Sequence, residues 1–335
     1  MPGQLVLVAG PGGAGSSTTA AALATVAVAR GRTVGLLDLA PSYGARDHLA
    51  PGQPAPALVE ARPTTDGPSA RTLRDLLDGV GLDPRLVDEV ASLPGADLVG
   101  ALVAAAHHAE RADLVVVDAG ARTLDLCVMA DRLPWLTGRV LPAHRGWLAS
   151  ARPLVATALG RWWPGEALST QLHAAHETAA LVQQSVARSV AVLVRPQHGR
   201  ERARSFEVGL ALHGVEVRAV LDPQAPTGDE RAIPVSPDEP LPTERLIERI
   251  ERGPGRGREC LAADGEDWLW RIPLPHLRSR DVTVRRTGDD LVIEAVGVRR
   301  VAVLPTALRR CRARAAVVRD QTLEVRFVPD QQETP

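Results

Sequence analysis

Short apolar runs recur along the first three quarters of the chain, and polar or turn-forming residues bound each run. Runs rich in valine and leucine are typical of strands that a parallel sheet buries on both faces. They predict strands at 4–9, 33–38, 113–118, 189–195 and 215–221. The intervening stretches predict helices at 18–30, 98–111, 168–188 and 200–213. Because strand and helix alternate, we expect an α/β domain with a mostly parallel sheet and helices on both faces.

The pattern changes after residues 252–258, RGPGRGR, where glycine and arginine dominate. Beyond this segment, apolar and polar residues alternate with a period of two, which is typical of strands with one buried face. Strands are predicted at 268–274, 281–286, 290–295, 298–304 and 322–328. The predicted organisation is an α/β domain over 1–250, a linker over 251–263, a small all-β sandwich over 264–329 and a tail over 330–335. Residues 51–69, rich in proline, are predicted to form an exposed loop or insertion.

The charge of the chain is nearly balanced, with 39 basic and 40 acidic groups among 335 residues and a formal net charge of −1. All of the basic groups are arginine, because the sequence contains no lysine. A high-GC coding bias accounts for this usage as readily as selection does. The balance argues against a strongly basic nucleic-acid-binding protein, and we expect no nucleic-acid partner.

The three cysteines, Cys127, Cys260 and Cys311, are too far apart to suggest a disulfide framework or a paired metal motif. Their number and spacing fit a reducing compartment. The amino terminus lacks the charged start and long apolar run of a secretory signal. No apolar stretch approaches the roughly 20 residues that a membrane-spanning helix needs. We therefore expect a cytoplasmic protein without a membrane span, at most peripheral at the membrane.

A glycine-rich turn joins the first predicted strand to the first predicted helix. Residues 10–17, GPGGAGSS, have the spacing G-x-x-x-x-G-x-S/T of a phosphate-binding loop, with Ser16 at the lysine position. Such a loop directs backbone N–H groups and a helix amino terminus at phosphate oxygens, and Ser17 stands where a hydroxyl binds Mg²⁺. The candidate nucleotide-binding residues are Gly10, Gly12, Gly13, Ala14, Gly15, Ser16, Ser17 and Thr18. The alternative is an inherited strand-to-helix turn that binds nothing.

Several segments resemble the arsenite-pump ATPase (ArsA) and tail-anchored-protein-targeting ATPase family. The loop is similar to that family's G-K-G-G-x-G-K-S/T-T. Residues 39–47 (LAPSYGARD) are similar to its switch I, and residues 118–124 (DAGARTL) to a shortened switch II. The segments 92–97 and 194–204 are similar as well, and the residues from 264 onward resemble the small heat-shock (α-crystallin-like) domain of many bacterial members. The resemblance covers most of the chain and implies a P-loop NTPase-type fold.

The resemblance also implies roles for two acidic residues. Asp47 corresponds to the family's residue that orients the attacking water, and Asp118 would associate with Mg²⁺ together with Ser17. Read without the resemblance, Asp47 is an ordinary surface acid and Asp118 a cap of the next segment. The cofactors that the resemblance implies are ATP or ADP with Mg²⁺.

Departures from the family pattern gather where nucleotide chemistry would occur. The family's first loop lysine, which reaches the partner's phosphates across a dimer, is Pro11 here, and its second lysine is Ser16. The strand that ends in an adenine-contacting asparagine ends here in Leu221, Asp222 and Pro223. Phosphoryl transfer depends on positioning and charge neutralisation, so loss of such a cation costs roughly 10³-fold or more in rate. The family's paired zinc-binding cysteines are absent too, so no zinc or other metal site is expected.

Three functions remain open on these observations. The leading one is a catalytically impaired family member, a pseudo-ATPase that acts as a binding or scaffold subunit and pairs with itself or with an intact ArsA-like paralogue. The second is a working ATPase that drives ion transport or the transfer of a membrane-protein client. The third is a nucleotide-independent, chaperone-like holder of hydrophobic clients. Four tryptophans lie where the family builds its client groove and serve either core packing or a client surface: Trp135, Trp147, Trp162 and Trp163.

Overall fold

The computed structural model of this chain describes residues 3–39, 43–60, 74, 83–140, 165–198, 200–225, 229–236, 238–252 and 259–330. Its amino-terminal part is built on a seven-stranded sheet. The strands are β1 (Gln4–Ala9), β2 (Val34–Asp38), β3 (Ala57–Val59), β4 (Leu114–Gly120), β5 (Val190–Val194), β6 (Glu216–Asp222) and β7 (Ala232–Pro234). Their order in the sheet is β3-β2-β4-β1-β5-β6-β7, and each neighbouring pair is parallel.

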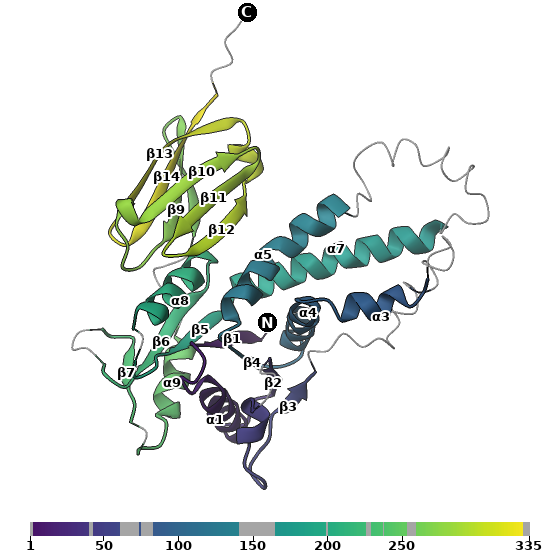
Figure 1. Cartoon of the computed structure of the whole chain (residues 1–335), viewed down its shortest axis with the longest axis vertical. Helices are drawn as coiled ribbons and strands as arrows, with labels where there is room; N and C mark the ends of the chain where they lie inside the picture. The colour runs from purple at the N-terminus through teal and green to yellow at the C-terminus, as the bar shows by residue number, and fades with distance from the viewer. Residues whose placement is uncertain are drawn as a thin grey trace, which may run out of the picture.

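Helices cover both faces of this sheet (Figure 1). One face packs against α1 (Ser16–Ala29) and α9 (Thr243–Glu251), and the other against α4 (Ala96–Ala109), α5 (Thr123–Val140), α7 (Gly165–Ala187) and α8 (Arg200–Leu212). Alternate residues of β1 show this division, because Val6 and Val8 join the core beneath α1, whereas Leu5 and Leu7 join the core beneath α4. The prediction of a mostly parallel α/β sheet is confirmed.

The segment predicted as an exposed loop, 51–69, contains a strand in its described part. β3 lies there and pairs with β2 from Gly35 to Leu37 at the edge of the sheet. Only Val59 of its three residues is buried. A three-residue edge strand among prolines carries no periodic signal, so the sequence pattern missed it; residues 61–69 lie outside the described part.

The carboxyl-terminal part consists of two antiparallel sheets that face each other across one core. Their strands are β8 (Cys260–Asp264), β9 (Asp267–Pro273), β10 (Val282–Thr287), β11 (Asp290–Ala295), β12 (Val298–Val303), β13 (Cys311–Arg319) and β14 (Thr322–Pro329). The sheet orders are β10-β11-β12 and β13-β14-β9-β8. The core includes Trp270, Ile293 and Phe327, and the predicted all-β sandwich is confirmed. Its first strand begins inside the segment predicted as a linker, 251–263.

β13 is the longest strand of the sandwich, yet the sequence pattern did not predict it. Residues 312–316 of this strand are all exposed, and the strand forms one edge of its sheet. An edge strand with no buried face over half its length lacks the alternation on which a strand prediction depends. The backbone pairing with β14, from Cys311 to Arg319, defines the strand instead.

α8 lies between the parallel sheet and the β-sandwich (Figure 1). Its Phe206 and Leu210 belong to the core of the parallel sheet, whereas its Val208 and Leu212 belong to the core of the sandwich. One helix therefore supplies apolar side chains to both parts of the molecule. The two parts are packed together and not merely tethered by the linker.

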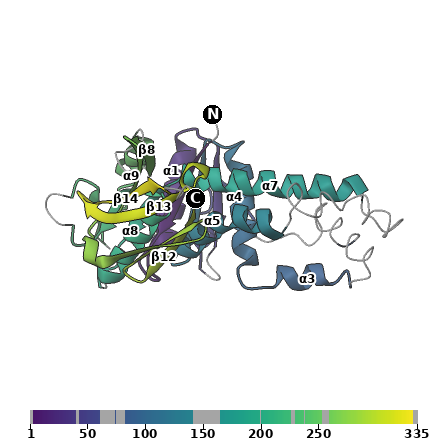
Figure 2. The same ribbon diagram turned by 90° about the horizontal axis from the view of Figure 1, so that it is seen from above.

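α5 and α7 pack against each other and extend beyond the sheet, as seen from above in Figure 2. Trp135 lies on α5, with the Arg132 guanidinium 5.6 Å from the centre of its ring. The other three candidate tryptophans, Trp147, Trp162 and Trp163, lie outside the described residues. Among the helices that the structure describes, none combines the length and apolar character required to cross a membrane.

Candidate functional site

The glycine-rich turn leaves β1 at the carboxyl edge of the parallel sheet and enters α1. Gly13 and Gly15 have φ angles of +80° and +92°, in the left-handed region that residues with a Cβ atom avoid. At Gly10, a Cβ atom would lie 2.6 Å from the carbonyl oxygen of Val194 on β5. The loop thus has glycine where its backbone path and its approach to β5 require it.

α1 begins directly after this loop, two residues earlier than the sequence predicts. The residue before it, Gly15, supplies no side-chain cap, and the first turn contains no acidic residue. N–H groups at a helix start lack intrahelical acceptors and carry the positive end of the helix dipole. An anion at this end of α1 would therefore meet N–H donors that no capping side chain occupies.

Two serines open α1 and face different neighbours. Ser16 is almost fully buried. Its Oγ packs against Gly120, where an added Cβ atom would lie 3.3 Å from this oxygen. The Ser17 hydroxyl donates a hydrogen bond to the carboxylate of Asp118. Burial raises the pKa of Asp118, the bond from Ser17 lowers it, and the nearby charge of Asp38 raises it further, so that the net pKa is raised.

Asp38 ends β2, and it is paired in the sheet with Asp118, which lies two residues before the end of β4. Asp118 also accepts a hydrogen bond of 3.2 Å from the backbone N–H of Ala45. Asp38 accepts one of 3.3 Å from the N–H of Arg46. The segment similar to switch I is thus held by backbone donors against the carboxyl ends of both strands. Ser17, Asp38 and Asp118 lie close together, and the association of Ser17 and Asp118 with Mg²⁺ stays a prediction.

Asp47 lies in η1 (Ala45–His48), a short 3₁₀ turn that packs against α1. Its side chain accepts a hydrogen bond of 3.0 Å from the backbone N–H of Gly44 and so caps its own turn. Gly44 has no room for a side chain, since a Cβ atom there would be 1.9 Å from Asp38 Oδ2. Asp47 is exposed, and orientation of a water molecule by this residue stays a prediction.

The segment similar to switch II continues from β4 into α5. Thr123 donates a 2.7 Å hydrogen bond to the carbonyl oxygen of Gly120. Arg122 pairs with Asp97 at 2.5 Å, at the start of α4. The hydrogen bond from Arg122 lowers the pKa of Asp97, against a smaller opposing effect of burial. This ion pair joins the segment 92–97 to the segment similar to switch II, and the family resemblance singled out these two segments separately.

A cavity of about 990 Å³ opens beside the loop. Gly13, Gly15 and Thr18 line it, as do Leu221, which lies in β6, and Pro223, which follows β6. Pockets of a few hundred to about 1,000 Å³ accommodate small molecules and cofactors of nucleotide size. The volume of this cavity lies within that range, and binding of an adenine nucleotide there stays a prediction.

The charged side chains of the cavity wall are less suited to a phosphate group than its volume is. Of the described side chains that line it, the basic ones are Arg195, His48 and His198. Arg195 donates from Nη1 to Asp222 Oδ2 at 3.0 Å and from Nη2 to Glu207 Oε2 at 3.2 Å. Both carboxylates are buried. A phosphate group would have to draw the guanidinium away from two desolvated anions, which is costly.

Arg195 and Glu207 are the residues that the sequence reasoning missed at this site, and Asp222 was noted only as part of the strand end at the expected adenine contact. Arg195 follows β5 and Asp222 ends β6, so adjacent strands bring them to the same edge of the sheet. The opposite charges at the ends of two predicted strands were the signal from which this pair could have been predicted. Glu207 on α8 gave no such signal, because its place within a predicted helix does not show which distant residues it contacts.

Over the described residues, no group of three or more His, Cys, Asp or Glu side chains is arranged to hold a metal ion.

The parallel sheet, the glycine loop at its carboxyl edge and the appended sandwich define a P-loop NTPase-type α/β protein with a small β-sandwich domain. Residues 265–327 match the family model described as the HSP20-like domain found in ArsA. The uncharacterized protein SCO2128 of Streptomyces coelicolor is 31% identical over 388 aligned residues, which cover 98% of each chain. Protein Rv2184c of Mycobacterium tuberculosis is 40% identical over 65 residues, 19% of this chain and 16% of that protein. The chain belongs to the ArsA family, with an HSP20-like domain at its carboxyl terminus.

Proposed function

We propose that this chain is a catalytically impaired ArsA-family protein, a pseudo-ATPase that works as a binding or scaffold subunit. One observation carries the proposal: the cavity keeps the glycine loop and the start of α1, while Arg195, the arginine on its wall, is already neutralised by Asp222 and Glu207. Phosphoryl transfer needs a cation that neutralises the charge on the transferred group in the transition state. A guanidinium fixed by two buried carboxylates is poorly suited to that task.

The proposed ligand is ADP or ATP with Mg²⁺. The N–H groups of the loop and of the start of α1 would contact the phosphate oxygens, and Ser17 and Asp118 would hold the Mg²⁺ that neutralises part of their charge. Without lysine, more of the binding energy has to come from these backbone donors and from the apolar wall near Leu221. We therefore expect binding that is weaker than in a lysine-containing loop, and no turnover.

The test compares ATP and ADP binding with Mg²⁺-dependent phosphate release, by calorimetry and by a single-turnover assay. The unmodified protein is expected to release no phosphate. Ser16→Lys is expected to tighten nucleotide binding by about tenfold or more, because a charge-assisted hydrogen bond is worth about 1.5–3 kcal/mol. Ser16→Ala is the matched control, which removes the hydroxyl and adds no charge. Robust hydrolysis by the unmodified protein would overturn the proposal.

A working ATPase is the second candidate, and one contact favours it. The Ser17 hydroxyl and Asp118 carboxylate still meet, as a Mg²⁺ site next to the phosphates would require. Pro11→Lys, which adds the family's first loop lysine, separates the two candidates. A protein that already hydrolyses ATP needs no such lysine, whereas a pseudo-ATPase subunit is expected to gain at most binding.

The proposed partner is a second copy of this chain or an intact ArsA-like paralogue, since a subunit without its own cation still presents half of a nucleotide interface. Sedimentation of the pure protein, alone and mixed with a lysine-containing paralogue, tests this part. A heterodimer whose turnover needs the paralogue's lysines supports the scaffold role. A monomer under both conditions contradicts it.

A further inference from the structure

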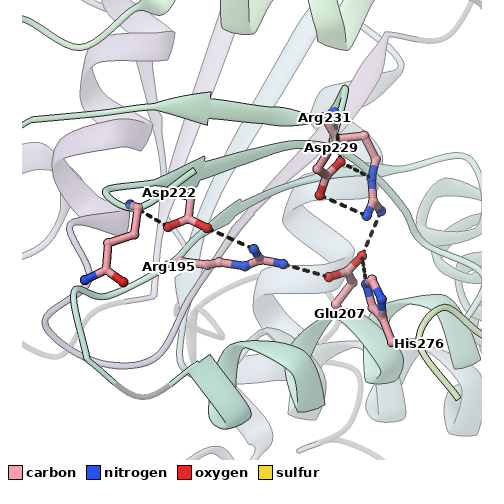
Figure 3. Close-up of polar contacts among 7 residues, drawn as sticks. Arg195, Glu207, Asp222, Asp229, Arg231 and His276 are labelled. Atoms are coloured by element: carbon pink, nitrogen blue, oxygen red, sulfur yellow. Dashed lines mark hydrogen bonds and ion pairs between the residues drawn. The ribbon is translucent and has the colours of Figure 1, made fainter. Parts of the chain in front are cut away.

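We propose that Glu207 couples the docking of the β-sandwich to the wall of the phosphate-loop cavity, with His276 as the contact on the sandwich side and Arg195 as the contact on the cavity side. The proposal deepens the proposed function, because the wall that it concerns belongs to the same cavity. It is argued from four segments that meet at one buried carboxylate (Figure 3).

Glu207 lies on α8 and is completely buried. Its Oε2 accepts a 3.2 Å hydrogen bond from Nη2 of Arg195. Its Oε1 lies 2.7 Å from Nη1 of Arg231, just before β7, and 3.2 Å from Nε2 of His276. A buried carboxylate stays ionised only where such partners compensate for lost hydration. Burial alone would raise the pKa of Glu207, but His276 and Arg231 lower it to about 2.

His276 is the contact that the sandwich makes with this carboxylate. It lies between β9 and β10, and its backbone has a φ angle of +64°, in the left-handed region that a histidine rarely adopts. Arg204 of α8 donates a hydrogen bond to its carbonyl oxygen. α8 therefore holds both the backbone and the ring of His276, and this strained conformation persists because those contacts fix it.

Arg195 carries the contact to the cavity. In Figure 3 its guanidinium lies between Asp222 and Glu207. The other oxygen of Asp222, Oδ1, accepts a 2.8 Å hydrogen bond from the backbone N–H of Gln224. Arg195 and Pro223 both line the cavity. The turn after β6 is therefore held through Asp222 and Arg195 by the carboxylate that also holds the sandwich.

The shared carboxylate makes the two positions dependent on each other. When the sandwich leaves α8, Glu207 loses its hydrogen-bond partner His276 and gains water on that side, so its hold on Arg195 weakens. Loss of that hold loosens the turn that carries Pro223. Coupling of this kind is reciprocal by linkage, so a change at the cavity wall must also alter docking of the sandwich.

Amide hydrogen exchange of the full-length protein, without nucleotide, tests the coupling. The Arg195 amide donates to Leu221 and the Gln224 amide to Asp222, so both report on the cavity wall. His276→Ala is expected to speed exchange of both amides roughly tenfold through local opening. His276→Gly, which relieves the backbone strain as well, is expected to act in the same way, because the ring is the element lost in both.

The matched control is Arg280→Ala. Arg280 lies four residues further along the chain, and its guanidinium pairs with the neighbouring Asp281. It is expected to leave the Arg195 and Gln224 amides at the unmodified rate. Unchanged exchange in both His276 variants, or an equal increase in Arg280→Ala, would overturn the coupling.

The reverse direction uses the cavity side. Asp222→Asn is expected to speed exchange of the Leu274 amide, which donates to Gln321 within the sandwich at 2.7 Å. No effect on Leu274 in a folded Asp222→Asn protein would contradict the reciprocity. Because no step uses nucleotide, a failed coupling and a failed binding proposal give different results: the first leaves these exchange rates unchanged, and the second appears as absent binding in the unmodified protein.

Discussion

The phosphate-loop cavity and the junction between α8 and the β-sandwich use charge in opposite ways. At the cavity, backbone N–H groups remain, but Ser16 stands at the lysine position. At the junction, three cationic or basic side chains surround the single carboxylate of Glu207. Arg195 belongs to both regions, and its guanidinium is turned to the carboxylates. Arg195, although it lines the cavity, is therefore paired with carboxylates that belong to the fold.

We expect the largest loss of stability from a substitution that breaks the junction between α8 and the β-sandwich. Glu207→Ala removes the shared anion and leaves Arg195 and Arg231 without their buried partner, so we expect a loss of about 3–5 kcal/mol in unfolding free energy. Guanidinium denaturation measures it. Glu294→Ala is the control, because Glu294 pairs with Arg285 and Arg299 at the exposed surface of the sandwich. The control is expected to cost less than about 1 kcal/mol; equal losses would contradict the contrast between the regions.

Acid titration of stability is expected to show the next largest effect. The pKa of Glu207 is about 2 in the folded protein, below the ordinary value of 4.5. The unfolded chain therefore binds this proton first as the pH falls. The contribution, on the order of 3 kcal/mol, is fully present above pH 4.5 and is lost progressively toward pH 2.

The measurement is denaturation at pH steps through that window, with Glu207→Gln as the comparison. The variant carries no titrating group at this position, so its stability is expected to fall less steeply between those pH values. Parallel pH profiles for the two proteins would show that Glu207 does not contribute in this way.

A smaller effect is expected in the phosphate loop itself. Gly13→Ala places a Cβ atom on a residue with a φ angle of +80°, whereas Gly12 has no such angle and open space around it. We expect Gly13→Ala to cost about 1–2 kcal/mol, and Gly12→Ala to cost much less. Thermal and chemical denaturation of the two variants measure the difference. Equal costs would show that the left-handed turn is not maintained.

The smallest effect is expected at the switch II ion pair. Arg122 and Asp97 have side chains 36% and 44% exposed, so water and salt screen their attraction. A double-mutant cycle with Arg122→Gln and Asp97→Asn is expected to give a coupling of about 0.5 kcal/mol. A coupling comparable with the Glu207 loss would mean that this pair, too, behaves as a buried contact.

The fold was largely predictable from the sequence because its signals are local and strong. The predicted strands 4–9 and 290–295 agree with β1 and β11 to the residue. Buried parallel strands are continuous apolar runs, and apolar and polar residues alternate in sandwich strands, so the pattern of each strand indicates which of its faces are buried. β3 and β13 were missed for the same reason, since an edge strand with little buried surface leaves no such pattern.

The candidate site was predictable only in part. The glycine loop, Ser17 and Asp118 could be located because a strand, a turn and a helix in succession fix their positions. The state of Arg195 could not be predicted, since its two partners lie 12 and 27 positions away. The capping role of Asp47 depends on the φ and ψ angles of one short turn, which the resemblance to switch I does not specify.

The parallel α/β domain, the all-β domain and the phosphate-type loop without lysine could all be recognised from the sequence alone. Those properties follow from the order and spacing of residues along the chain. The contacts made by the arginine on the cavity wall, in contrast, become visible only in the folded chain. Arg195, Glu207 and His276 come from a strand end, a helix and a second domain, and the complete burial of Glu207 strengthens its contacts because the carboxylate has little water to compete with its partners.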